Sequence, residues 1–163
     1  MIPVFRLTFI VAWVCSATLA APTSVEHVPA DSVFSQPPDI TMREPTQPRE
    51  DEAVALWARV AFQFTYDRVA IYYTTDGSDP QGTFGVPGNG STAVLLNSNA
   101  EVLFQFNEVT GGGTYDWWKA TLPAPTRAYG LTIRYKLSAW DTGGGAEVFT
   151  NGGAAYQFTN KLA

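Results

Sequence analysis

Large apolar side chains alternate with polar ones over most of the chain beyond residue 53. A period of two is typical of β-strands with one buried face, because successive side chains point to opposite sides of a strand. Such runs, with shorter β-branched and aromatic ones, predict strands at 54–64, 69–75, 93–96, 101–108, 115–123, 131–141 and 146–158. No segment has the period of an amphipathic helix. The chain is therefore predicted to be all-β.

Turn residues separate these runs at short intervals. The segment Asp76-Gly77-Ser78-Asp79-Pro80 joins an Asx side chain to a glycine, and three-glycine turns occur at 111–113 and 143–145. The sequence has 14 Gly, 11 Pro and 13 % aromatic residues, which favours short strands joined by tight turns. About seven strands at this spacing predict an immunoglobulin-like antiparallel β-sandwich over residues 51–163.

The first twenty residues have the pattern of a secretory signal peptide. Arg6 precedes an apolar run at 7–14, and small residues at Thr18 and Ala20 predict cleavage after Ala20. The apolar run is shorter than the roughly 20 residues that a membrane helix needs. We therefore expect an exported protein, extracellular or periplasmic, without membrane association after signal removal. Cys15, the only cysteine, lies inside this segment, so the mature chain is expected to form no disulfide.

The next segment, residues 21–50, contains six prolines among Ser, Thr and acidic residues, and few large apolar side chains. Such a segment can bury too little apolar surface to offset the conformational entropy that it would lose on folding. We therefore predict a disordered linker. The only histidine, His27, lies in it and is expected to be solvated.

The net charge of −5 is concentrated near this linker. Residues 21–52 hold seven acidic residues against Arg43 and Arg49, whereas acids and bases nearly balance from Ala53 onward. A nearly neutral folded part lacks the basic surface that nucleic acids require, so we expect no nucleic-acid partner.

Four motifs carry a resemblance to a known family. They are Val54-x-x-Trp57-x-x-Val60, the segment from Ile71 to Pro80, Trp117-Trp118-x-Ala120-x-Leu122-Pro123, and the segment from Ile133 to Trp140. Through these motifs, residues 53–151 resemble the N-terminal immunoglobulin-like (early-set) domain of secreted bacterial α-amylase-family enzymes (glycoside hydrolase family 13). In those enzymes the domain precedes the catalytic barrel. The resemblance implies a non-catalytic accessory module.

A (β/α)8 barrel takes about 250 residues and carries the catalytic carboxylates of that family. The sequence reaches only Ala163. We therefore expect either a free-standing module or the N-terminal part of a longer glycosidase whose barrel is not in this sequence.

Acidic side chains beyond residue 53 fall mostly in predicted turns or at strand ends, where they are expected to be solvated. Catalytic carboxylates need a rigid scaffold at a defined separation, so we expect no enzymatic activity and no cofactor. Asp76, Ser78 and Asp79 could offer oxygens to Ca²⁺. Because Ca²⁺ takes about six to eight oxygens, an Asx turn is favoured over a metal site.

The adjacent residues Trp117 and Trp118 cannot face the same side of one strand. Trp118 shares the parity of Ala120 and Leu122 and is assigned to the core, which places Trp117 outward together with Tyr115. The core face of the following strand is predicted to hold Ile133, Tyr135, Leu137 and Ala139. Its outward face would then hold Arg134, Lys136 and Trp140.

An outward tryptophan beside polar donors suits carbohydrate, because a sugar ring packs on the indole while polar side chains bond its hydroxyls. The candidate carbohydrate-binding residues are Trp117, Trp140, Tyr115, Arg134 and Lys136. The alternative is that the outer tryptophans pack on a loop, on the linker or on the barrel of a parent enzyme. The functions left open are α-glucan binding, docking on a glycosidase catalytic domain, membership of a longer glycosidase, and a role as an exported adhesion or interaction module.

Asn89-Gly90-Ser91 fits the acceptor pattern for N-glycosylation in a predicted surface loop. It would be used only in a eukaryotic secretory pathway.

Overall fold

The computed structural model describes residues 24–33, 40–61, 65–97, 103–107 and 113–163. Within these ranges the regular elements are β-strands, apart from two short 3₁₀ turns, η1 (Ala124–Arg127) and η2 (Thr150–Gly153). The chain is therefore all-β, as the alternation of side chains predicts. In the same ranges no helix has the length and apolar character needed to cross a membrane. The predicted signal peptide, residues 1–20, lies outside the described residues.

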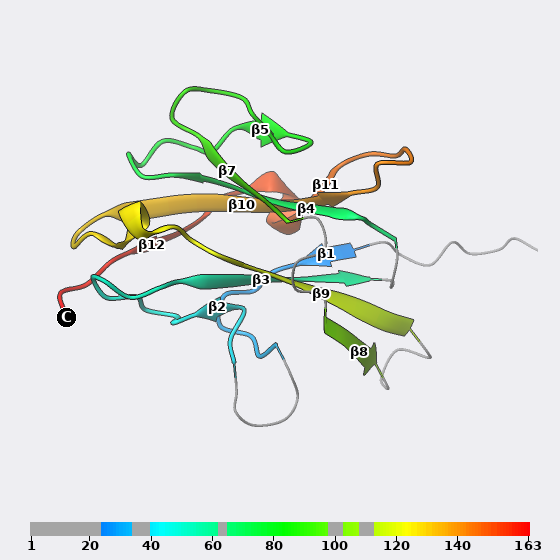
Figure 1. Cartoon of the computed structure of the whole chain (residues 1–163), viewed down its shortest axis with the longest axis horizontal. Helices are drawn as coiled ribbons and strands as arrows, with labels where there is room; N and C mark the ends of the chain where they lie inside the picture. Colours follow the sequence, from blue (N-terminus) through cyan, green and yellow to red (C-terminus); the bar gives the residue numbers. More distant parts are fainter. Residues whose placement is uncertain (1–23, 34–39, 62–64, 98–102, 108–112) are drawn as a thin grey trace, which may run out of the picture.

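One sheet has the strand order β1–β3–β9–β8, and β2 also pairs with β3 (Figure 1). Its strands are β1 (Ser24–Glu26), β2 (Arg43–Glu44), β3 (Ala55–Ala61), β8 (Leu103–Asn107) and β9 (Gly113–Thr121). All of these pairings are antiparallel. The register of β3 and β9 places Ala58 opposite Trp118 and Leu56 opposite Ala120, so the core-facing residues of the two strands share a face.

The second sheet has the order β11–β10–β4–β7, and β12 also pairs with β10. Its strands are β4 (Arg68–Thr74), β7 (Ala93–Asn97), β10 (Thr132–Trp140), β11 (Val148–Phe149) and β12 (Tyr156–Thr159). These pairings are antiparallel too, with Leu137 opposite Ile71 and Tyr135 opposite Tyr73. A separate two-stranded hairpin consists of β5 (Gly82–Thr83) and β6 (Val86–Pro87).

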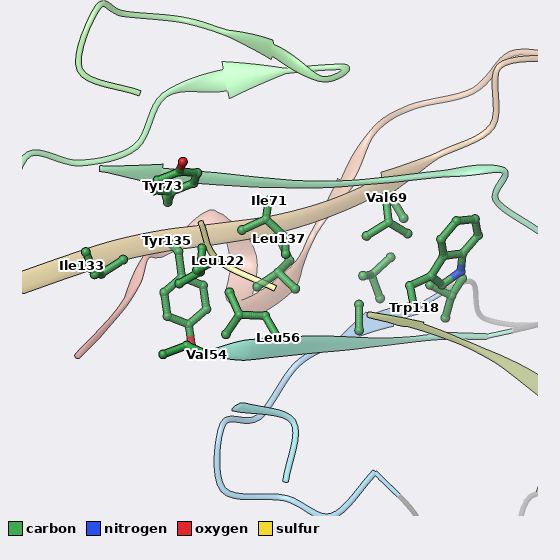
Figure 2. Close-up of a cluster of buried hydrophobic side chains, with 14 of the residues drawn as sticks. Val54, Leu56, Val69, Ile71, Tyr73, Trp118, Leu122, Ile133, Tyr135 and Leu137 are labelled. Atoms are coloured by element: carbon green, nitrogen blue, oxygen red, sulfur yellow. The ribbon is translucent and has the colours of Figure 1, made fainter. Parts of the chain in front are cut away.

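The two sheets form two layers, and the main hydrophobic core lies between them, as in a β-sandwich (Figure 1). Figure 2 shows side chains from both layers pointing into this space, among them Leu56 and Trp118 from one sheet and Ile71 and Leu137 from the other. The predicted core face of β10 is confirmed, because Ile133, Tyr135, Leu137 and Ala139 are all buried there. A cavity of about 10 Å³ between the sheets has room for about one water molecule, which is too little for an organic ligand.

The N-terminal segment belongs to the fold, and the prediction of a disordered linker over 21–50 is wrong for residues 24–33 and 40–50. β1 pairs with β3 through Val25 opposite Val60, and β2 pairs through Arg43 opposite Leu56. Val33 and Met42 are buried. Val25 packs in the main core, and Val33 and Met42 pack against Trp57 and Trp117, which offsets the ordering entropy of this segment. The domain therefore begins before residue 51.

His27 is a core residue rather than a solvated one. Its ring is 2 % exposed, its Nδ1 donates to the Trp57 carbonyl at 2.6 Å, and its Nε2 accepts from the Tyr135 hydroxyl at 3.0 Å. Tyr156 donates to the His27 carbonyl at 2.6 Å and packs edge-on against the ring. Burial lowers the pKa of His27 to about 4, so the ring is neutral near pH 7.

Twelve strands occur in the described ranges, four of them only two residues long, so the predicted number of about seven is not confirmed. The difference arises in three places. The N-terminal segment supplies β1 and β2, the glycine-rich loop supplies β5 and β6, and the predicted run 146–158 is divided by η2 into β11 and β12.

Candidate functional site

Trp117 lies on the outer face of the first sheet, as its parity predicts, but it is only 1 % exposed. It packs in a second hydrophobic cluster with Trp57, Val33 and Met42. The covering residues, Val33 and Met42, come from the segment that was predicted to be a linker. The predicted exposure of Trp117 is therefore wrong, because a distant part of the chain folds over this face.

Two cations lie beside these outer indoles. The Arg59 guanidinium is 5.8 Å from the ring centre of Trp117, and the Lys119 amine is 5.3 Å from that of Trp57. Arg59 also forms an ion pair with Glu26 of β1. This face of the sheet is thus held closed by both apolar and charged contacts.

Trp140 points away from the main core, as predicted, yet it is only 6 % exposed. It lies in a third cluster with Ala70 and Tyr72 on the outer face of the second sheet. Phe84 of the β5–β6 hairpin packs edge-on against it, with ring centres 5.8 Å apart and planes at 90°. The predicted exposure of Trp140 is wrong for the same reason as that of Trp117, because the chain covers its own outer face.

Arg134 and Lys136 do project from the outer face of β10, but both bind a carboxylate of the protein itself. Arg134 Nη2 is 3.1 Å and Lys136 Nζ is 2.6 Å from the two oxygens of Asp79. Gln81 donates to the same carboxylate at 2.7 Å. Asp79 therefore organises a small partly exposed charged cluster beside the turn after β4.

The five predicted carbohydrate-binding residues do not form one site. Tyr115 and Trp117 lie on β9 of the first sheet, whereas the other three lie on β10 of the second. The outer faces of two packed sheets point in opposite directions, so one ligand cannot lie across both. The side chain of Tyr115 is outside the described part of the chain.

Glu147, one of the acidic residues predicted to be solvated, instead accepts several hydrogen bonds from the protein. Its carboxylate accepts hydrogen bonds from the hydroxyls of Tyr72 at 2.7 Å, Ser138 at 2.6 Å and Thr83 at 2.7 Å, and from the backbone N–H of Phe84 at 2.7 Å. One carboxylate thus joins β4, β10 and the β5–β6 hairpin. Charge-assisted hydrogen bonds of this kind are stronger than neutral ones.

The β5–β6 hairpin lies against Tyr72. The Gly85 N–H donates to the Tyr72 hydroxyl at 2.7 Å, and burial together with Glu147 raises the pKa of this tyrosine. A Cβ on Gly82 would lie 2.3 Å from two ring carbons of Tyr72, so only glycine permits this close approach. The glycine-rich sequence at 81–90 indicates that the backbone approaches another element closely here. The alternation of side chains does not indicate that this element is β4 with Tyr72.

The turn of the hairpin presents an apolar tip. Phe84 and Gly85 both have positive φ, 47° and 77°, which is uncommon for a bulky residue such as phenylalanine. Phe84 is 48 % exposed and Val86 is 62 % exposed. The tip is fixed at its base by Glu147 and remains open to solvent at its apex.

The turn after β4 has the predicted form. Ser78 donates to Asp76 Oδ1 through its N–H at 2.9 Å and through its hydroxyl at 2.6 Å, which confirms the Asx turn. These bonds, together with a hydrogen bond from the Ser91 side chain, lower the pKa of Asp76 to about 2. Asp79 points instead to Arg134 and Lys136 and is not part of this arrangement.

No protein-family model matches the chain, and no curated protein matches it either. The likeness to the accessory domains of α-amylase-family enzymes therefore rests on the sequence motifs alone.

Proposed function

We propose that the chain is a secreted, non-catalytic, immunoglobulin-like accessory module of the α-amylase-family type, and that it acts by docking on a catalytic domain. Its secretion would follow from the predicted signal peptide, and its family from the motifs around Trp117 and Ile133. Two packed antiparallel sheets are compatible with such a module.

Docking is favoured over sugar binding by the exposure of the aromatic residues. The chain itself covers the outer tryptophans, whereas the tip of the β5–β6 hairpin is exposed. Trp117 and Trp140 offer no exposed indole face to a sugar ring. Phe84 and Val86, two residues apart in one short hairpin, are both exposed. Burying a fully exposed side chain of this kind contributes about 1.5–3 kcal/mol, and the exposed parts of Phe84 and Val86 would contribute roughly half of that each.

The rigidity of the hairpin base favours its use as an interface. Thr83 and the N–H of Phe84 bind Glu147, and Gly85 binds Tyr72, so both sides of the turn are held before a partner arrives. A tip that is already ordered loses little conformational freedom on binding. The unusual φ of Phe84 supports a role for this residue, because strained backbone positions cluster at binding sites.

Direct binding of α-glucan is a second candidate, and the half-exposed ring of Phe84 favours it. A sugar ring could stack on this aromatic face. The same hairpin would then bind polysaccharide instead of protein.

The proposal is tested with the α-amylase-family barrel domains encoded in the source genome, each produced without an accessory domain and mixed with the mature chain. We expect co-elution with at least one barrel in size-exclusion chromatography. The substitution Phe84→Asn should abolish co-elution while preserving the fold, because asparagine tolerates positive φ better than phenylalanine. Tyr129→Asn is the matched control, since Tyr129 is an exposed aromatic outside the hairpin.

Native gels that contain starch or glycogen distinguish the candidates. Normal migration with barrel binding supports docking, and slowed migration lost in Phe84→Asn supports glucan binding. If neither is seen, both are wrong and the exported interaction module replaces them. Sequencing the gene past the codon for Ala163 adds a further test, because an in-frame barrel there would make the docking partner part of the same polypeptide.

A further inference from the structure

We propose that Asn89 is an N-glycosylation site that takes an oligosaccharide from a lipid-linked pyrophosphate donor. This inference is independent of the docking role and of the family resemblance, and it concerns the chain in a eukaryotic secretory pathway. Asn89-Gly90-Ser91 is the only Asn-X-Ser/Thr triplet in the sequence whose middle residue is not proline.

The triplet lies in the connection between β6 and β7, and all three of its residues are exposed. The Gly88 N–H donates to the Gln81 carbonyl at 2.7 Å and closes the base of the hairpin just before Asn89. A Cβ on Gly90 would meet nothing within 4 Å, so the backbone between the acceptor and the serine lies in open space. The chain next to the acceptor therefore faces open space on the side of Gly90, while the Ser91 side chain is hydrogen-bonded to Asp76.

The Asn89 side chain is held by hydrogen bonds to its Oδ1 atom and by none from its Nδ2 atom in the described part of the chain. Oδ1 accepts from the Thr92 N–H at 2.9 Å and from the Thr92 hydroxyl at 2.8 Å. Within the described part of the chain, Nδ2 donates to no acceptor. Glycosylation changes only the nitrogen, so the bonds that order the loop are kept after the sugar is attached.

The transfer step balances without an added oxidant or reductant. The amide nitrogen of Asn89 forms a bond to the anomeric carbon of the first sugar as the bond from that carbon to the pyrophosphate oxygen breaks. The amide loses one proton, and the lipid pyrophosphate leaves. Ser91 supplies the hydroxyl that the acceptor pattern requires.

The test uses the full chain with its own N-terminal leader, and in parallel with a yeast secretion leader, expressed in a yeast secretory host. We expect intact-mass spectrometry of the secreted protein to show one N-glycan. Peptide-N-glycosidase should remove it and convert Asn89 to Asp in the peptide map. Glycan on the protein secreted with either leader supports the site.

Variants give the control. Asn89→Gln and Ser91→Ala should each abolish the modification, Ser91→Thr should retain it, and Asn151→Gln should not affect it, because Asn151 is exposed but lies outside any acceptor triplet. Thermal melting of each secreted variant shows that loss of glycan does not reflect loss of fold. The proposal is overturned if secreted, folded wild-type protein carries no glycan at Asn89, or if the glycan persists in Asn89→Gln.

Discussion

At the scale of single residues, the tryptophans show that a side chain on the outer face of a strand can still be buried. Trp117 and Trp118 point to opposite faces of β9, yet both are almost fully buried. Trp118 packs between the sheets, and Trp117 packs under Val33 and Met42. Each indole is therefore expected to stabilise the folded state as a buried core side chain does.

Truncation of either tryptophan should be strongly destabilising. Trp117→Ala and Trp118→Ala should each lower the free energy of unfolding by about 3–5 kcal/mol, because each removes a large buried side chain. Tyr129→Ala should change it by less than about 0.5 kcal/mol, since that side chain is 62 % exposed. Urea unfolding curves of the four proteins measure these values. A small effect for Trp117→Ala would show that the N-terminal segment does not cover this face in solution.

His27 should make the stability depend on pH in a defined window. Burial lowers the pKa of His27 from 6.5 to about 4 in the folded state. As the pH falls, His27 is therefore protonated at a higher pH in the unfolded chain than in the folded protein. The neutral His27 contributes fully to the free energy of unfolding above pH 6.5. This stabilisation is lost as the pH falls from 6.5 to about 4, and the total loss is about 3 kcal/mol.

Urea unfolding of the wild type and of His27→Gln at pH 7, 6 and 5 tests this expectation. The variant should lose less stability over the range, because glutamine does not titrate. Asp67 and Asp76, whose pKa values are lowered by hydrogen bonds, affect both proteins alike at lower pH. Parallel pH profiles for the two proteins would refute the assignment.

At the scale of elements, the β5–β6 hairpin depends on one close approach. Gly82 lies against the ring of Tyr72, which is fully buried and fixed through its hydroxyl by Glu147 and Gly85. The ring cannot move away without loss of these bonds. A side chain at position 82 must therefore displace the hairpin.

Gly82→Ala should open the hairpin while the sandwich stays folded. We expect faster amide hydrogen exchange in peptides over 81–88 and greater solvent exposure of Trp140, which Phe84 covers. Gly90→Ala is the control, because a Cβ there meets no atom within 4 Å. Unchanged exchange in Gly82→Ala would contradict the contact with Tyr72.

The difference between predicted and observed elements has a physical cause. Parity along a strand is a local property, so the core faces of β3, β9 and β10 could be predicted from the alternation at Leu56, Trp118 and Leu137. Which outer faces are covered depends on segments far away in sequence, such as Val33 over Trp117. Neither the alternation nor the composition contains that contact.

The candidate site was harder to predict than the fold. Arg134 and Lys136 were correctly placed outward, but Asp79, which binds both, is more than fifty residues earlier in the chain. Glu147 likewise gave no local signal, because a single acid after a glycine turn is typical of a solvated loop. Its role follows only from the three elements that converge on it.

At the scale of the whole molecule, the N-terminal segment and the last strands close the structure together. Lys161 donates its N–H to the Pro48 carbonyl at 3.0 Å, and Glu50 donates to the Lys161 carbonyl at 2.8 Å. His27 contacts Tyr135 of β10 and Tyr156 of β12. Residues 24–33 and 40–50 therefore belong to the folded structure.

Removing this segment should prevent cooperative folding. A chain that starts at Asp51 should lose the near-ultraviolet circular dichroism of its buried tryptophans and unfold over a broad range of urea, because Trp57 and Trp117 lose their cover. A chain that starts at Ala21 is the matched control and should unfold in a single sharp transition. Equal stability of the two chains would restore the interpretation of 21–50 as a linker.

The bonds of His27 to Tyr135 and Tyr156 also bear on the order in which the chain can fold during synthesis. His27, which directly follows β1, is made early, but its hydrogen-bonding tyrosines leave the ribosome only after more than a hundred further residues. Contacts between such distant residues form late and slow folding. Nascent chains that stop before Tyr156 should remain sensitive to protease, and resistance should appear only when β12 has emerged.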